Sequence, residues 1–318
     1  MCIRDRGGII DMELKYVFGP VPSRRLGKSL GISPIPRKTC NYSCIYCQLG
    51  RTDKMIGERK EFFPLKDIIN EFKDYLKESF DFDVVTIVGE GEPTLYSKLG
   101  ELIKEVKKIT DKPVAVITNG ALLSSKEVRD ELMNADILLP SIDGYNEDTA
   151  KKIDRPLGTI HFKDELEGLI EFSKEYKGQL LLEIMLISGI NCDKNSIEHF
   201  KEILKKIKYD RVYLNTPVRP PAESFVKVIS QEEMKYAVKE LGGISIDMLS
   251  SGEFFSEIKD SYEAILNIIR RHPMNQFEIN SFLESRKEKL EYNIFEKLEK
   301  DKKINCILYK GIKTYRLK

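Results

Sequence analysis

The 318-residue chain contains no tryptophan, only three histidines and six cysteines. Six cysteines in a chain of this length are too few for a disulfide scaffold. No run approaches the ~20 apolar residues that a membrane-spanning helix requires, and the charged amino terminus has no apolar signal segment. Lys and Arg total 52 against 51 Asp and Glu, so the net charge of +1 gives no general reason to bind nucleic acid or a membrane. We expect a soluble cytoplasmic protein without a membrane partner, whose function is carried by local motifs.

The composition is that of a folded protein, with 41% hydrophobic and 32% charged residues. This apolar fraction and length are sufficient for one large domain, or for a large and a small one. The first eleven residues, MCIRDRGGIID, resemble nothing downstream, and MELKYVFGPVP from Met12 looks like a natural start. We interpret residues 1–11 as a non-native extension without a role.

Short apolar runs typical of strands alternate with amphipathic segments typical of helices. The predicted strands are residues 30–35, 84–88, 114–118, 137–142, 180–187 and 212–215. The predicted helices are residues 65–80, 98–109, 126–134, 163–176 and 197–207. This alternation predicts an α/β fold of parallel βα units, a partial (β/α)6 TIM-like barrel, with a flat doubly wound sheet as the competing arrangement. Either fold would gather ligand chemistry at the carboxyl ends of its strands.

The pattern changes after residue 250, which divides the chain into a barrel domain, 12–250, and a small carboxyl-terminal domain, 251–318. The small domain is predicted to have helices at 257–271, 276–284 and 287–300, then strands at 303–309 and 313–317 joined by a turn at Lys310-Gly311. This order predicts a winged-helix-like domain. From Asp260 onward 13 Lys and Arg face 9 Asp and Glu. The small excess leaves two interpretations, a nucleic-acid reader and a protein-contact or lid domain.

Three cysteines, Cys40, Cys44 and Cys47, follow the first predicted strand at offsets of four and three. A loop with this spacing can turn three sulfurs toward one metal centre. Structural zinc would need a fourth Cys or His, and the neighbouring sequence offers none. Three thiolates on a [4Fe-4S] cluster would leave one iron open to a small molecule. The alternatives are a zinc site completed by a distant residue and three unrelated cysteines.

The spacing CxxxCxΦC, with Tyr46 as the aromatic Φ, resembles the radical S-adenosylmethionine (radical SAM) superfamily. The flanking FGPVPSRRLG at 18–27 and QLGRT at 48–52 are similar to the branch of wyosine-type tRNA base synthetases. The resemblance runs from about residue 18 to 222. It implies that the three cysteines hold a [4Fe-4S] cluster and that SAM chelates the fourth iron. It also implies that an electron from a donor such as flavodoxin or ferredoxin splits SAM into methionine and a 5′-deoxyadenosyl radical.

The segment GEGEPT, residues 89–94, follows the second predicted strand. Glycines let a backbone approach a ligand closely, and carboxylates can hold an ammonium group. The segment resembles the superfamily's GGE element, which receives the methionine amino group of SAM. Gly91 and Glu92 match best, while Gly89 and Glu90 leave the register open. The alternative is an ordinary βα loop.

Small polar side chains end the next two strands, at Asn119 and at Ser141 and Asp143. They suit hydrogen bonds to ribose hydroxyls or to the SAM carboxylate, or ordinary turn and capping roles. Arg155 could clamp a carboxylate or phosphate, or be a surface residue before a turn. The predicted cofactor-binding set is Tyr46, Gly89, Glu90, Gly91, Glu92, Asn119, Ser141, Asp143 and Arg155.

Two functions follow from these motifs. The first is a radical SAM enzyme that acts on an RNA base, a peptide or a small metabolite. The second is an Fe–S redox-sensing regulator that binds nucleic acid through its carboxyl-terminal domain, although a sensor has no use for polar residues at successive strand ends. The chain lacks the second cysteine cluster of archaeal and eukaryotic wyosine-base enzymes, which argues against a tRNA substrate. Since all cluster and SAM candidates precede residue 250, we expect the small domain to serve substrate docking.

Overall fold

A computed structural model gives the structure of residues 14–77, 81–246, 254, 256, 258, 260–286 and 293–318. The predicted extension at 1–11 and the predicted domain boundary at 250/251 lie outside these residues.

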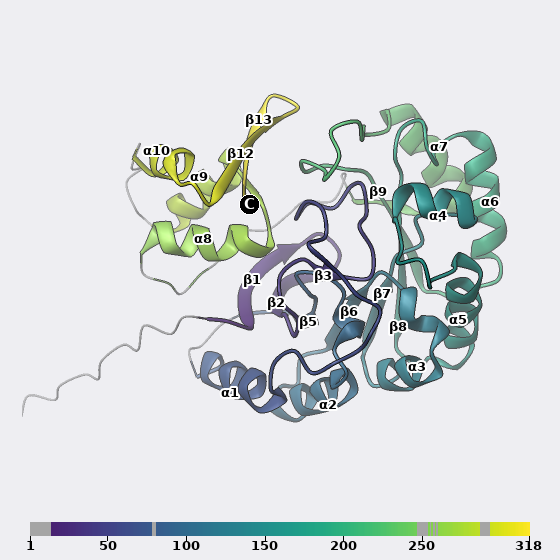
Figure 1. Ribbon diagram of the computed structural model, residues 1–318, viewed down its shortest axis with the longest axis horizontal. Coiled ribbons are helices and arrows are strands. Elements are labelled where there is room, and N and C mark those ends of the chain that lie inside the picture. Colours follow the sequence, from purple (N-terminus) through teal and green to yellow (C-terminus); the bar gives the residue numbers. More distant parts are fainter. Residues whose placement is uncertain are drawn as a thin grey trace, which may run out of the picture.

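One eight-stranded sheet organises the larger part of the chain. Its order is β1 (Val17–Ser23), β2 (Gly27–Ile32), β5 (Val84–Ile87), β6 (Val114–Thr118), β7 (Ile137–Pro140), β8 (Gln179–Met185), β9 (Arg211–Asn215), β10 (Ile244–Ser245). Neighbours from β2 to β10 pair in parallel, whereas β1 is antiparallel to β2. The sheet curves inside an outer arc of helices (Figure 1) and ends at β1 and β10. This arrangement is an open, partial barrel, not a flat sheet with helices on both faces.

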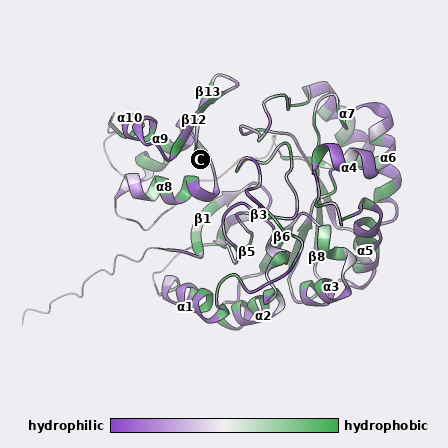
Figure 2. Ribbon diagram, in the orientation of Figure 1, coloured by the Kyte–Doolittle hydropathy of each residue, from purple (hydrophilic) through white to green (hydrophobic). Residues whose placement is uncertain are grey.

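The helices of the arc are amphipathic and pack their apolar sides on the sheet. They are α1 (Leu65–Tyr75), α2 (Leu99–Ile109), α3 (Lys126–Leu132), α4 (Glu147–Ile153), α5 (Phe162–Glu175), α6 (Lys194–Leu204) and α7 (Gln231–Leu241). Figure 2 shows the apolar and polar residues alternating along them. α1, for example, buries Ile68, Ile69, Phe72 and Tyr75. Replacing a fully buried Phe72 by Ala would cost roughly 3–5 kcal/mol of unfolding free energy.

In the larger part of the chain, all six predicted strands and all five predicted helices are present, with differences at their ends. The strands β1, β3 (Thr39–Cys40), β4 (Lys54–Met55) and β10 and the helices α4 and α7 were not predicted. β1 contains two prolines, which weaken a strand signal, and β10 has only two residues. Helix α7 did carry a readable start, because Ser230 and Glu233 form a capping box.

A smaller unit follows, with helices α8 (Ser261–Arg271), α9 (Gln276–Ser285) and α10 (Asn293–Lys300). Its three-stranded antiparallel sheet has the order β11 (Met274–Asn275), β13 (Ile312–Leu317), β12 (Ile304–Tyr309). We call residues 260–286 and 293–318 the carboxyl-terminal unit. The turn predicted at Lys310-Gly311 joins β12 and β13, and both residues have positive φ, 52° and 76°. A two-residue hairpin of this kind requires that conformation.

The carboxyl-terminal unit lies beside β1 and meets the loops that follow β2 and β9 (Figure 1). The Tyr309 hydroxyl donates to the Pro217 carbonyl at 2.7 Å. The Arg219 guanidinium donates to the Pro273 carbonyl at 2.8 Å and to Glu278 at 2.9 Å. The two parts of the molecule are therefore joined by directional polar contacts.

Across the described ranges, no helix combines the length and apolar character needed to cross a membrane.

Candidate active site

The three cysteines lie on the loop between β3 (Thr39–Cys40) and β4 (Lys54–Met55), after β2 on the carboxyl edge of the sheet. We call residues 40–55 the cluster loop. Its middle is tied to the end of α4, because Ile45 N–H donates to the Ile153 carbonyl at 2.9 Å. Ser43 N–H likewise donates to the Asp154 carbonyl at 2.9 Å. Ile45 is also fully buried, so packing and hydrogen bonds both hold the middle of the loop in place.

Cys40, Cys44 and Cys47 carry free, partly exposed thiols. Burial raises the pKa of each thiol. For Cys47, backbone N–H groups and the charges of Arg316 and Lys38 oppose that rise in pKa. Metal coordination deprotonates such thiols, and backbone donors such as Tyr42 N–H, 3.4 Å from the Cys40 sulfur, stabilise the thiolates.

Among the residues that the structure describes, no three His, Cys, Asp or Glu side chains are grouped to hold one metal ion. The thiolates of a [4Fe-4S] cluster bind different irons, so they stand farther apart than the ligands of a single zinc ion. Three thiols lie on one loop that hydrogen bonds hold in place, and backbone N–H groups point at sulfur. This donor set therefore fits a [4Fe-4S] cluster.

Glu92 belongs to the GEGEPT loop, is buried, and contacts the end of β6. Its Oε1 accepts from Thr94 N–H at 2.9 Å and from the Thr118 hydroxyl at 2.6 Å. Among the residues that the structure describes, Asn119 N–H is the one donor to its Oε2, at 2.8 Å. Burial raises the pKa of Glu92, and these donors oppose the rise. Because a carboxylate oxygen has two lone pairs, Oε2 can also accept from an ammonium group.

Gly89 and Gly91 bring the GEGEPT loop against residues 35–39, the segment that leads into the cluster loop. A Cβ on Gly91 would stand 1.8 Å from the Thr39 carbonyl oxygen, and one on Gly89 would stand 2.5 Å from the Ile35 side chain. Both positions therefore need glycine for packing within the protein. Their close approach brings Glu92 next to the cysteines.

Glu90 belongs to the predicted cofactor-binding set, yet its carboxylate faces the carboxyl-terminal unit. It lies 3.4 Å from Arg271 Nε, 3.8 Å from Arg270 Nε and 4.0 Å from Arg37 Nε. Burial raises the pKa of Glu90, and the three arginines oppose the rise. The structure thus separates the two carboxylates of the motif.

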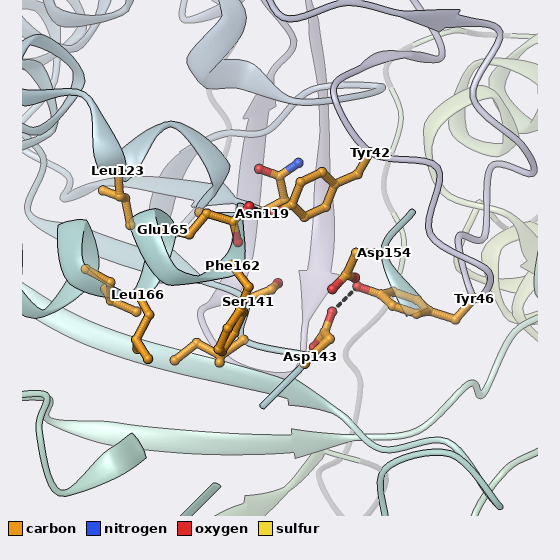
Figure 3. A pocket seen from close by; sticks show the side chains of 14 residues that line it. Tyr42, Tyr46, Asn119, Leu123, Ser141, Asp143, Asp154, Phe162, Glu165 and Leu166 are labelled. Carbon is orange, nitrogen blue, oxygen red and sulfur yellow. Dashed lines mark hydrogen bonds between the residues drawn. The ribbon is translucent and has the colours of Figure 1, made fainter. Parts of the chain in front are cut away.

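Tyr46, which is partly exposed, and Asp143, which is buried, form a pair at the end of β7 (Figure 3). The Tyr46 hydroxyl donates to Asp143 Oδ2, and Met185 N–H donates to Oδ1 at 2.7 Å. Burial raises the pKa of Asp143 to about 6. Ser141 and Asn119 line the same cavity, which has about 450 Å³ of empty space, part of it open to solvent. Four residues of the predicted set therefore meet in one place.

Three further polar residues of this cavity were missed by the sequence analysis: Tyr42, Asp154 and Glu165. The Tyr42 hydroxyl donates to Glu165 Oε1 at 2.5 Å. Burial raises the pKa of Glu165 to about 7, and burial together with the Asp143 and Glu165 charges raises that of Asp154. Tyr42 lies between the cysteines, a position that signals its proximity, whereas Glu165 has no sequence signal on its amphipathic helix.

The lining of the cavity is also partly apolar. The apolar side chains come from Leu123, Ile142, Phe162, Leu166 and Leu169. A cavity lined by both polar and apolar side chains suits a ligand that carries both a polar and an aromatic part.

Arg155 lies outside the lining of this cavity. It has a positive φ of 46° and binds Glu223 at 2.5 Å. Glu223 also binds Arg51 at 2.9 Å and donates its N–H to the Ile45 carbonyl at 3.0 Å. The two arginines lower the pKa of Glu223 to about 2. Glu223, in the segment after β9, therefore binds the cluster loop through Arg51 and Ile45, and it binds the segment after α4 through Arg155.

Comparison with known proteins agrees with this geometry. Residues 35–207 match the radical SAM superfamily. A radical SAM methyltransferase from Sphaerobacter thermophilus has a similar fold, with a TM-score of 0.51 and 15% identity over 69% of this chain and 68% of that chain. The chain belongs to the radical SAM superfamily. It is an enzyme whose cofactors are a [4Fe-4S] cluster and SAM, and membership implies SAM cleavage at the cluster.

Comparison with individual proteins shows which members of the superfamily the chain is similar to. A UPF0026 protein of Methanocaldococcus jannaschii is 35% identical over 306 residues, which cover 94% of each chain. A Brachyspira hyodysenteriae protein named GTPase Obg is 42% identical over 267 residues, 82% of this chain but only 39% of that protein. The chain is thus similar over nearly its whole length to a UPF0026 protein.

Proposed function

We propose that this protein cleaves SAM reductively and uses the resulting radical to abstract hydrogen from a substrate. When bound, the cluster supplies the electron that splits SAM into methionine and a 5′-deoxyadenosyl radical. The observation that carries the proposal is that the cluster loop, Glu92 and the Tyr46–Asp143 pair meet at one edge of the sheet. Cys40, Cys44 and Cys47 are the residues that would hold the cluster.

Several polar groups in or beside the cavity have a role toward SAM in this proposal. Glu92 Oε2 accepts from the methionine amino group, because its other donor, Asn119 N–H, leaves a lone pair free. Asn119, Ser141 and Asp143 bind the carboxylate and ribose side. The apolar side chains of the cavity receive the adenine ring. Glu165 and Tyr42 orient each other at the cavity wall.

The carboxyl-terminal unit is proposed to be a winged-helix-like substrate-docking domain. Support comes from its order of helices and strands, α8-β11-α9-α10-β12-β13, and from its sheet order β11-β13-β12. The resemblance to wyosine-type synthetases supports an RNA base as the substrate, beside a peptide or a small metabolite. A flavodoxin or ferredoxin is the proposed electron donor.

The second candidate is a redox-sensing regulator that reads nucleic acid with the same unit. Its support is the winged-helix-like element order. Against it, Tyr309 and Arg316 on the two strands of the hairpin bind the Pro217 and Pro220 carbonyls of the barrel. Because these contacts hold the hairpin on the barrel, they favour a docking unit of one enzyme over a separate nucleic-acid reader.

Anaerobic reconstitution tests the proposal. The protein should bind about four irons per chain and, with SAM and a low-potential reductant, release 5′-deoxyadenosine and methionine. Cys44→Ala should abolish iron binding, whereas Cys306→Ala, at an exposed thiol on β12, should leave it unchanged. An intact cluster that binds no SAM and yields no 5′-deoxyadenosine with several strong reductants would support the sensor instead.

A further inference from the structure

The end of strand β13 reaches the cluster loop. Arg316 Nη1 donates to the Gln48 carbonyl at 3.2 Å and to the Pro220 carbonyl at 3.3 Å. Gln48 directly follows Cys47. A residue near the carboxyl end of the chain therefore lies against the part of the loop that carries the third thiol.

A second cation lies on the same side. Gly50 has both groups nearby, since a Cβ built there would stand 3.7 Å from Lys38 Nζ and 3.9 Å from Arg316 Nη2. Lys38 approaches Asp53 at 3.6 Å, and that carboxylate is 63% exposed. Arg316 forms no ion pair with any described carboxylate, because its hydrogen-bond partners are neutral carbonyl groups. Its positive charge is thus uncompensated by a neighbour.

Arg316 is also held in place from the barrel. Arg37, just ahead of the cluster loop, donates to the Leu317 carbonyl at 2.9 Å and to the Lys318 carbonyl at 2.5 Å. Arg316 itself is only partly exposed. A charge fixed at a partly buried site is screened less by water and salt than a freely moving surface charge.

We propose that Arg316 is a positioning residue that raises the reduction potential of the cluster, so that docking of the carboxyl-terminal unit makes the cluster easier to reduce. The inference rests on the proposed function, because it requires the cluster at the three cysteines. The step is the transfer of one electron from a low-potential donor to the cluster, and no bond of the protein forms or breaks. The reduced cluster carries one more negative charge, which a nearby fixed cation stabilises.

The test compares the reduction potentials of reconstituted full-length variants by an anaerobic titration followed by electron paramagnetic resonance. Arg316→Gln should hold about four irons and have a lower potential than the parent. The expected shift of the reduction equilibrium is about tenfold, or about 59 mV for a one-electron couple. Arg316→Lys keeps the charge and should remain closer to the parent. Lys313→Gln is the matched control, since Lys313 lies on the same strand but pairs with Glu299 at 2.6 Å.

An Arg316→Gln protein with full iron and an unchanged potential would overturn the proposal, as would an equal fall in Lys313→Gln. If Arg316→Gln holds too little iron for the titration, Arg37→Gln is measured in its place. This substitution removes the hydrogen bonds that hold the end of β13 on the barrel. An unchanged potential there would also overturn the proposal. The potential is measured without SAM, so a failure of SAM cleavage would refute the proposed function and leave this result standing.

Discussion

Glu90 on the barrel and Arg271 on α8 form a buried ion pair, with 3.4 Å between Glu90 Oε2 and Arg271 Nε. Two residues further on, Glu92 accepts from Thr118 and Asn119 inside the barrel. One short loop therefore joins the carboxyl-terminal unit to the proposed SAM site.

Glu90→Gln should destabilise the protein without removing a SAM contact. The substitution leaves Arg271, with a side chain only 3% exposed, without its charged partner. Loss of one partner of a buried pair should lower the free energy of unfolding by about 3 kcal/mol, measured by urea denaturation. Glu101→Gln, at an exposed pair with Lys98, is the control and should have little effect. A Glu90→Gln protein that loses as much SAM affinity as Glu92→Gln would contradict this division of the motif.

Glu92→Gln should weaken SAM binding and leave the iron content unchanged. The charge-assisted hydrogen bond to the amino group is worth roughly 1.5–3 kcal/mol, or about one to two decades in the Kd for SAM. Asn119→Ala should weaken binding less, because its side chain offers a neutral contact. Calorimetric titration of SAM into the reconstituted proteins measures both. Equal SAM affinity in the parent and Glu92→Gln would remove Glu92 from the site.

The metal-free protein should lose stability as the pH rises through about 7. Burial raises the pKa of Glu165 from 4.5 to about 7, so the folded state holds this proton more tightly than the unfolded state. The stabilisation is complete below about pH 4.5 and is lost as the pH passes the folded-state value. The change attributable to Glu165 should be roughly 2 kcal/mol, allowing for its partial exposure.

Denaturant unfolding at pH 5 and pH 8 checks this expectation. Glu165→Gln should flatten the dependence, leaving the part due to the other buried carboxylates, among them Asp143, whose pKa is about 6. Glu167→Gln, exposed on the same helix, should keep the full dependence. A parent protein that is more stable at pH 8 than at pH 5 would show that burial at Glu165 has been misjudged.

Glu223→Gln should speed the release of iron to a chelator while leaving the SAM Kd unchanged. Glu223 binds Arg155 and Arg51 and so holds the cluster loop against the segment after β9. Loss of a supporting contact around a metal site typically costs about 10–100-fold. Arg51→Gln, which removes the more exposed partner, should have the smaller effect. If Arg155→Gln weakened SAM binding but not iron retention, Arg155 would be a cofactor ligand after all.

The sequence alone determined the strand–helix alternation, the three cysteines on one loop and the polar residues at the ends of β6 and β7. These features follow from local periodicity, spacing and the rule that parallel strands end at one edge of a sheet. The Lys310-Gly311 turn could also be predicted from the sequence, because glycine easily adopts the positive φ that a two-residue hairpin requires.

Only the tertiary structure decided which carboxylate of GEGEPT faces the proposed SAM site, because Glu90 and Glu92 are chemically alike and differ only in their distant partners. The same holds for Glu165, which becomes a cavity residue when α5 packs near the cluster loop. Edge strands β1 and β10 depend on neighbours more than on their own residues. The contact of Arg316 with Gln48 joins segments at opposite ends of the chain, and no local pattern encodes such a meeting.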